Sequence, residues 1–89
     1  MSHKIIGIAD SNNAIQTDYI KQQLEAINTW KPELETQFEN ENCELLGTIC
    51  KGQARCPTYI ILKHGVYKTH MHGKIDNSKL FEWLLAKLG

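Results

Sequence analysis

Apolar and polar residues follow two different periods along the chain, and the period changes several times. Residues 4–10 (KIIGIAD) are apolar at odd and even positions alike, and so are residues 58–64 (TYIILKH). Such runs are typical of strands that are covered on both faces. Residues 33–39 (ELETQFE) and 66–72 (VYKTHMH) alternate instead, which predicts half-exposed edge strands.

Three segments between and after these strands have the period of an amphipathic helix. The first follows the capping side chains of DSNN (10–13), ends before Pro32, and has apolar residues at helical spacing. These are Ile15, Tyr19, Ile20, Leu24 and Ile27. The second runs from about 42 to 51, and its inward positions are Leu45, Leu46, Ile49 and Cys50.

The third helix covers residues 76–89, is capped near Asp76 or Asn77, and stops at Gly89. The positions predicted to be buried are Leu80, Phe81, Leu84, Leu85 and Leu88. The element order is therefore β-α-β-α-β-β-α in a single α/β domain, residues 1–89. The β-α-β unit requires a right-handed crossover between parallel strands, and the hairpin at Gly65 joins antiparallel strands. A mixed four-stranded sheet in the order 2-1-3-4, flanked by helices on both faces, meets both requirements.

Four features of the second half carry a family resemblance. Pro57 and Thr58 enter the third strand, KHG (63–65) forms the hairpin tip, Gly73 closes the fourth strand, and FEWLLAKLG (81–89) ends the chain. In this combination the sequence resembles the thioredoxin/glutaredoxin family over nearly its whole length, and it is nearer to glutaredoxin in size. The resemblance implies a thioredoxin-like fold with a cis peptide bond before Pro57.

The chain departs from that family at the catalytic element, a Cys-x-x-Cys between the first strand and the first helix, where the helix N-terminus stabilises a thiolate. The corresponding residues 9–19 (ADSNNAIQTDY) contain no cysteine, and Gly7 stands near the place of the buried acidic residue of thioredoxins. An ordinary dithiol-disulfide oxidoreductase is therefore excluded. We expect a protein that is not an enzyme of this kind.

The three cysteines are Cys43, Cys50 and Cys56. On one helix, Cys43 and Cys50 would have Cα atoms roughly 10.5 Å apart, beyond the roughly 7 Å limit for a disulfide, and they are interpreted as small apolar packing residues. Cys56 is different, because the resemblance places the residue before the proline in a substrate-facing loop. Neighbouring Arg55 would favour its thiolate. The alternative function is therefore a single-cysteine thiol protein, or a glutathione-binding glutaredoxin-like oxidoreductase, that uses Cys56.

The resemblance also implies a recognition face, on which an extended partner segment pairs with the backbone beside Pro57. It comprises residues 11–15, residues 55–57 and residues 72–74. The predicted binding residues are Ser11, Asn12, Asn13, Arg55, Cys56, Pro57, Thr58, His72, Gly73 and Lys74. The first hypothesis is therefore a redox-inactive adaptor that binds a protein partner. A simpler interpretation is that Pro57 only sets the entry of the strand.

No cofactor is expected under the first hypothesis. Under the alternative, glutathione would be held by Arg55, Lys74, Asp76 and Asn77, although the glycine pair expected by resemblance is reduced here to HGKIDN (72–77). His70 and His72 share one side of a strand and are a weak alternative for metal ligands. A third ligand is not evident in the neighbouring sequence, and no metal is expected.

Composition sets the remaining expectations. The 42% of apolar and 22% of charged residues are ordinary for a globular protein, and ten basic side chains offset ten acidic ones. Bulk charge thus gives no reason to expect a nucleic-acid or membrane partner. Without a visible signal peptide, three cysteines suggest a reducing compartment, so we expect a cytoplasmic protein.

Overall fold

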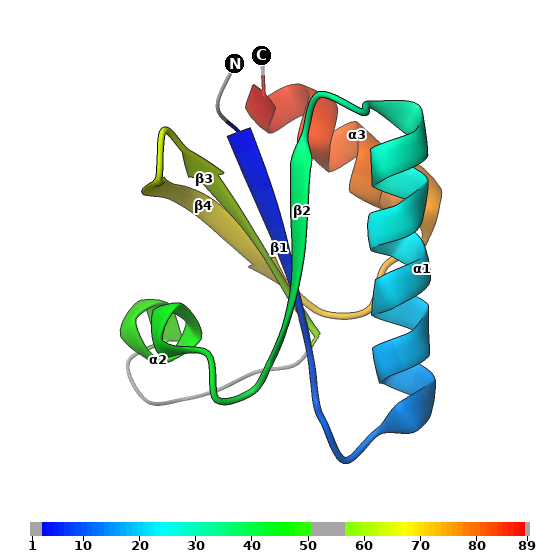
Figure 1. Ribbon diagram of the computed structural model, residues 1–89, viewed down its shortest axis with the longest axis vertical. Coiled ribbons are helices and arrows are strands. Elements are labelled where there is room, and N and C mark those ends of the chain that lie inside the picture. The colour runs from blue at the N-terminus through cyan, green and yellow to red at the C-terminus, as the bar shows by residue number, and fades with distance from the viewer. Residues whose placement is uncertain (1–2, 51–56, 89) are drawn as a thin grey trace.

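The computed structural model describes residues 3–50 and 57–88, and the side chains of Ile49 and Cys50 are outside this description. Seven elements follow the predicted order. They are β1 (His3–Ala9), α1 (Ala14–Trp30), β2 (Glu35–Asn40), α2 (Glu44–Cys50), β3 (Thr58–Lys63), β4 (Val66–His72) and α3 (Asn77–Leu88). Figure 1 shows the strands as one twisted sheet with both described chain ends near the same edge of the molecule.

The sheet has the strand order β2-β1-β3-β4, which confirms the predicted order 2-1-3-4. β1 pairs with β2 in parallel and with β3 antiparallel, so that Gly7 lies between Phe38 and Tyr59. β4 returns antiparallel to β3 with a register shift at Ile61 and Leu62. The two doubly apolar strands are thus central and the two alternating strands are edges, as the pattern predicts.

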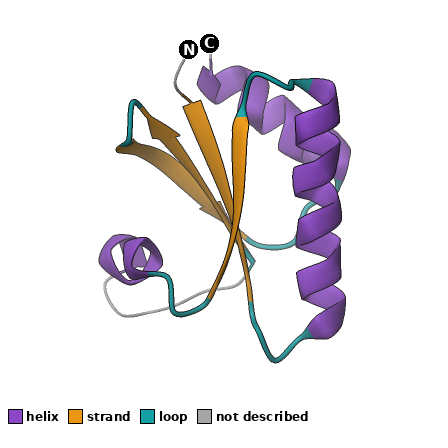
Figure 2. Ribbon diagram, in the orientation of Figure 1, coloured by secondary structure: helices purple, strands orange, loops and turns teal. Residues whose placement is uncertain are grey.

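Helices cover both faces of the sheet (Figure 2), α1 and α3 on one side and α2 on the other. Because side chains alternate along a strand, Ile5 and Ala9 enter the core under α1 and α3, whereas Ile6 and Ile8 pack towards Leu46 of α2. The larger core lies under the two long helices, and α2 covers only a small cluster.

The closest approach of helix and sheet is at Gly7. A Cβ atom built there would lie 2.8 Å from Cγ2 of Ile20 and 3.2 Å from both Cδ atoms of Leu24. A glycine at this position therefore lets α1 pack directly on β1. A buried acidic side chain of the thioredoxin type would not fit at Gly7 unless Ile20 and Leu24 moved.

Local signals explain where the helices begin. Asn13 caps α1, because its Oδ1 accepts a hydrogen bond from the backbone N of Gln16 at 3.0 Å. Asp76 does the same for α3, accepting from the backbone N of Lys79 at 2.8 Å, so the predicted cap is confirmed. Helix α2 begins at Glu44, two residues later than predicted, and Cys43 lies before it.

Two side chains in the predicted apolar stripes are exposed. Leu85 was expected in the core but is 55% exposed, because α3 buries a narrower face whose fully buried members are Leu80 and Leu84. Ile15 keeps the helical spacing but is 81% exposed. It lies in the first turn of α1, at the end of the sheet where β1 has already finished, so no strand covers it (Figure 1).

Candidate binding surface around Pro57

Residues from three separate parts of the chain surround a hollow of about 140 Å³ at one end of the sheet. The start of α1, the entry to β3 and the segment after β4 contribute to it. We call this the Pro57 surface, and its lining residues are Asn13, Ile15, Gln16, Tyr19, Pro57 and Lys74. Ile15 and Lys74 are exposed, and Pro57 is buried.

The start of α1 is held in place by its own polar side chains. The Oε1 atom of Gln16 accepts a hydrogen bond from the backbone N of Asp10 at 2.7 Å, and the Thr17 hydroxyl donates to the Asp10 carbonyl at 3.3 Å. Together with the Asn13 cap, these bonds tie the first turn of the helix to the end of β1. The exposed Ile15 is therefore presented from a fixed turn.

Pro57 is fixed by a contact between segments that are far apart in sequence. The backbone N of Gly73 donates to the Pro57 carbonyl at 2.9 Å. Gly73 has a φ of 102°, a left-handed conformation that favours glycine. In the next pair of the ladder, the Thr58 hydroxyl and Nδ1 of His72 are 2.9 Å apart. The end of β4 is thus joined to the entry of β3.

A buried chain of hydrogen bonds fixes the segment after β4. The Tyr59 hydroxyl donates to Oε1 of Gln23, and Nε2 of Gln23 donates to the Ile75 carbonyl at 2.8 Å. The Tyr19 hydroxyl donates to the same carbonyl at 2.6 Å. Burial, with a smaller contribution from Tyr19, raises the pKa of Tyr59 far above its ordinary value, so this hydroxyl stays protonated as a donor.

Lys74 is placed by the residue that follows it. Since the Ile75 carbonyl is held by Tyr19 and Gln23, the backbone at residue 74 lies against α1. The Lys74 ammonium lies 5.0 Å from the centroid of the Tyr19 ring, within the range of a cation–π contact. The structure therefore places one positive charge at the rim of the hollow.

The predicted residues separate into four groups. Asn13, Pro57 and Lys74 line the hollow, and Thr58, His72 and Gly73 form the backbone support directly next to it. Arg55 and Cys56 lie outside the described residues, and so does the peptide bond before Pro57. The resemblance did not identify Gln16 and Tyr19 as binding residues. Tyr19 belongs to the predicted apolar stripe of the first helix, and the only sequence signal of Gln16 is its spacing of three residues from the Asn13 cap.

Ser11 and Asn12 lie in the loop before the cap and do not line the hollow. The backbone N and the hydroxyl of Ser11 both donate to the Glu41 carboxylate, at 2.9 and 2.7 Å. The bond from the Ser11 backbone, and to a smaller extent the bond from its hydroxyl, hold the pKa of Glu41 below its ordinary value. Asn12 donates from its backbone to Oδ1 of Asp10 at 2.9 Å. Ser11 therefore ties the loop to the segment after β2.

Cys56, which carries the cysteine alternative, lies outside the described residues, and the described cysteine and histidines have other contacts. Cys43 is half-buried and packs against the small core beside α2, which agrees with its apolar interpretation. The rings of His70 and His72 are 4.8 Å apart, and Nδ1 of His70 lies 2.7 Å from the Tyr67 hydroxyl. Within residues 3–50 and 57–88, no group of three or more potential ligands is placed to hold a metal ion.

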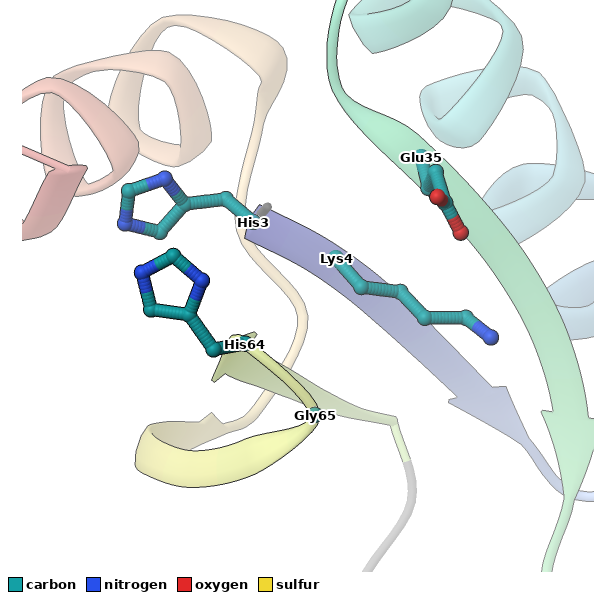
Figure 3. Close-up of a pocket in the computed structure, with 5 residues that line it drawn as sticks. All are labelled: His3, Lys4, Glu35, His64 and Gly65. Carbon is teal, nitrogen blue, oxygen red and sulfur yellow. The ribbon is translucent and has the colours of Figure 1, made fainter. Parts of the chain in front are cut away.

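A second hollow, of about 520 Å³, lies at the other end of the sheet and is drawn in Figure 3. We call it the His3 hollow, and it is lined by His3, Lys4, Glu35, His64 and Gly65. The imidazoles of His3 and His64 face each other in this view. His3 is only 4% exposed, and its Nε2 atom is buried without a hydrogen-bond partner. No sequence signal had marked it.

Charges around His3 are mostly positive. Burial lowers the pKa of His3, and Lys68, Lys63 and His64 lower it further. At neutral pH the buried imidazole is therefore uncharged.

No helix in the described part of the chain is long and apolar enough to cross a membrane.

The sheet order, the helices on both faces and the Pro57–Gly73 contact together define a thioredoxin-like α/β domain. Solved structures with the same fold support this class. The chain is similar to desulfothioredoxin from Desulfovibrio vulgaris Hildenborough in its reduced form, with a TM-score of 0.78 and 11% identity over 97% of this chain and 82% of that one. For Fasciola hepatica thioredoxin the values are 0.72 and 17%, over 97% and 81%.

Thioredoxin O2 from Arabidopsis thaliana in the oxidized state gives a TM-score of 0.70 and 14% identity, over 96% of this chain and 74% of that one. No protein-family model and no curated protein matches the sequence. At these identities the similarity establishes the thioredoxin-like fold and nothing finer. What the chain does must therefore be argued from its own residues.

Proposed function

We propose that this chain is a redox-inactive thioredoxin-like module that binds a protein partner through the Pro57 surface. The observation that carries the proposal is the composition of the first turn of α1. Where thioredoxins have a dithiol, this chain has the Asn13 cap and the exposed Ile15, directly beside Pro57 and Lys74. Amide and aliphatic side chains cannot exchange disulfides, whereas they can form a contact surface.

Exposure of Ile15 supports binding in particular. An isoleucine that is 81% exposed in a rigid helical turn costs solvation free energy in the free protein, and covering it with a partner recovers that cost. The hollow beside it is small enough to receive a single side chain. A surface that has no catalyst can still bind an extended segment.

Affinity capture from the source cell tests the proposal when wild type, Ile15→Ser and Cys56→Ser are compared as baits, each with and without reductant. We expect the same partner with wild type and Cys56→Ser, insensitive to reductant, and its loss with Ile15→Ser. Ile15 is exposed, so its substitution should leave the fold intact, which circular dichroism checks. Partners that disappear with Cys56→Ser or are released by reductant would instead establish thiol chemistry at Cys56.

A disulfide-reductase assay provides the enzymatic counterpart. With insulin as substrate and dithiothreitol as electron donor, the protein should precipitate insulin no faster than a sample without protein, while a dithiol thioredoxin serves as positive control. Turnover above the blank that is abolished by Cys56→Ser would contradict the proposal.

A further inference from the structure

Among the described residues, the Pro57 surface offers hydrogen-bond donors and a positive charge, but it has few free acceptor atoms. The oxygen atoms of both lining amides are already used, Oδ1 of Asn13 by the backbone N of Gln16 and Oε1 of Gln16 by the backbone N of Asp10. Within the described part of the chain their amide nitrogens have no acceptor. Lys74 adds an ammonium group, which has donors only.

Carboxylates are absent from the lining among the described residues. Three carboxylates on the adjoining segments accept hydrogen bonds within the protein. Asp10 accepts from the backbone of Asn12, Glu41 accepts twice from Ser11, and Asp76 caps α3. None of the three is an ion-pair partner of Lys74. The N-terminus of α1, which opens on the same hollow, adds a partial positive charge.

The other half of the surface is apolar and sits directly beside these donors. Ile15 stands at the rim, the Pro57 ring lies in the wall, and the Tyr19 ring lies under the Lys74 ammonium. A volume of about 140 Å³ accommodates one aliphatic side chain and not a larger body such as a nucleotide. Among the described residues Lys74 is the only charged one in the lining, which gives a polyanion little to bind there.

We propose that the occupant is an extended protein segment in which an apolar side chain lies directly next to an aspartate or glutamate. The apolar side chain fills the hollow against Ile15 and Pro57. The carboxylate accepts hydrogen bonds from Lys74 and from the free amide groups of Asn13 and Gln16. This inference rests on the proposed function and adds the chemistry by which the partner is recognised.

Selection from a library of linear random peptides on phage, followed by synthetic peptides, tests the pairing. The most enriched peptide is made in three fluorescent forms, unchanged, with its acidic residue changed to the amide, and with its apolar residue changed to alanine. Each form is titrated by fluorescence anisotropy against wild type, Ile15→Ser, Lys74→Gln and, as a matched control for loss of one exposed lysine, Lys63→Gln.

We expect enrichment of an apolar residue beside an acidic one, and a roughly fivefold weaker affinity for Lys74→Gln, the size of an exposed ion pair. That loss should vanish against the amide peptide, since both changes remove the same interaction. Ile15→Ser should weaken binding of the unchanged and the amide peptides, which both keep the apolar residue, and should have little effect on the alanine peptide. Lys63→Gln should behave as wild type.

The two possible failures are distinct. Peptides that bind through Ile15 but lack an acidic preference, or that bind Lys74→Gln as well as wild type, overturn the inference and leave the proposed function standing. If no peptide is enriched over an unrelated bait, or if every enriched peptide is indifferent to Ile15→Ser, the proposed function itself fails and the inference fails with it.

Discussion

At the Pro57 surface, the polar groups of the buried Tyr59 and Gln23 and of the half-buried Tyr19 come together, and each of them has a hydrogen-bond partner. At the opposite end of the same sheet, His3 is buried to a similar degree, but its Nε2 atom has no partner and its charged neighbours are mainly lysines. The two ends therefore share the same strands and differ in whether their buried polar atoms are satisfied.

This difference decides how each end responds to a change in conditions. A satisfied network is costly to break, and burial, which raises the pKa of Tyr59, keeps its hydroxyl protonated as a donor at neutral pH. A buried imidazole without a partner is tolerated only while it is uncharged, since a buried charge is expensive. The Pro57 end therefore keeps one geometry, whereas the His3 end is stable only while the His3 imidazole is uncharged.

The largest expected effect comes from breaking the satisfied network. Gln23→Ala removes a side chain that is 2% exposed, leaves the Tyr59 hydroxyl without an acceptor, and frees one bond to the Ile75 carbonyl. We expect a loss of about 2–4 kcal/mol in the free energy of unfolding, measured in urea. Gln22→Ala, an exposed neighbour on the same helix, is the control and should change it by less than about 0.5 kcal/mol. Equal losses from both would contradict the network.

The second prediction concerns acid. The pKa of folded His3 lies below the value of 6.5 that applies to the unfolded chain, so on acidification the unfolded chain takes up the proton first. The stabilising contribution is complete above about pH 6.5 and is lost below it, by at most about 1.4 kcal/mol per pH unit. Urea unfolding between pH 7.5 and about pH 5 measures this slope.

His3→Phe is the matching variant, since it keeps a ring and removes the titrating group. It should flatten the slope in that range and should be no less stable than wild type at pH 7.5, because the unpaired buried nitrogen is gone. A slope that His3→Phe leaves unchanged would assign the acid sensitivity to other groups.

The smallest effect is expected at the hairpin tip. His64 has a φ of 55° and Gly65 one of 79°, so both central residues of this two-residue turn are left-handed, as in a type I′ turn. Asparagine adopts this conformation more readily than histidine. His64→Asn should therefore raise the free energy of unfolding by a few tenths of a kcal/mol at pH 7.5. A clear loss of stability would show that the imidazole facing His3 contributes a contact of its own.

The strand and helix order follows from the sequence because it depends on local periodicity. The doubly apolar runs, the alternating runs and the capping side chains at Asn13 and Asp76 each act over a few residues, and the structure confirms them. The absence of cysteine at the start of α1 is a property of the sequence as well. The class of fold could therefore be predicted, and the lack of a Cys-x-x-Cys at this position is visible in the sequence itself.

Tertiary structure alone decided which residues at the ends of the elements are covered. Ile15 has the spacing of a core residue, but it is exposed because the sheet ends before it. His3 and Gln23 are polar residues that are buried in the fold, and no local sequence pattern predicts their burial. The periodicity predicts which face of its helix or strand a side chain lies on. It does not predict how far the sheet or helix that packs against that face extends.

The polar contacts of the Pro57 surface were equally beyond the sequence. Gln23 and Tyr59 are 36 residues apart, and Tyr19 and the Ile75 carbonyl are 56 apart. Only after the sheet has brought α1, β3 and the segment after β4 together does each donor have its acceptor. The sequence by itself determined which elements form and in what order, whereas the packing of those elements decided where Lys74 lies and which polar atom remains without a partner, because both depend on groups that only the complete fold brings into contact.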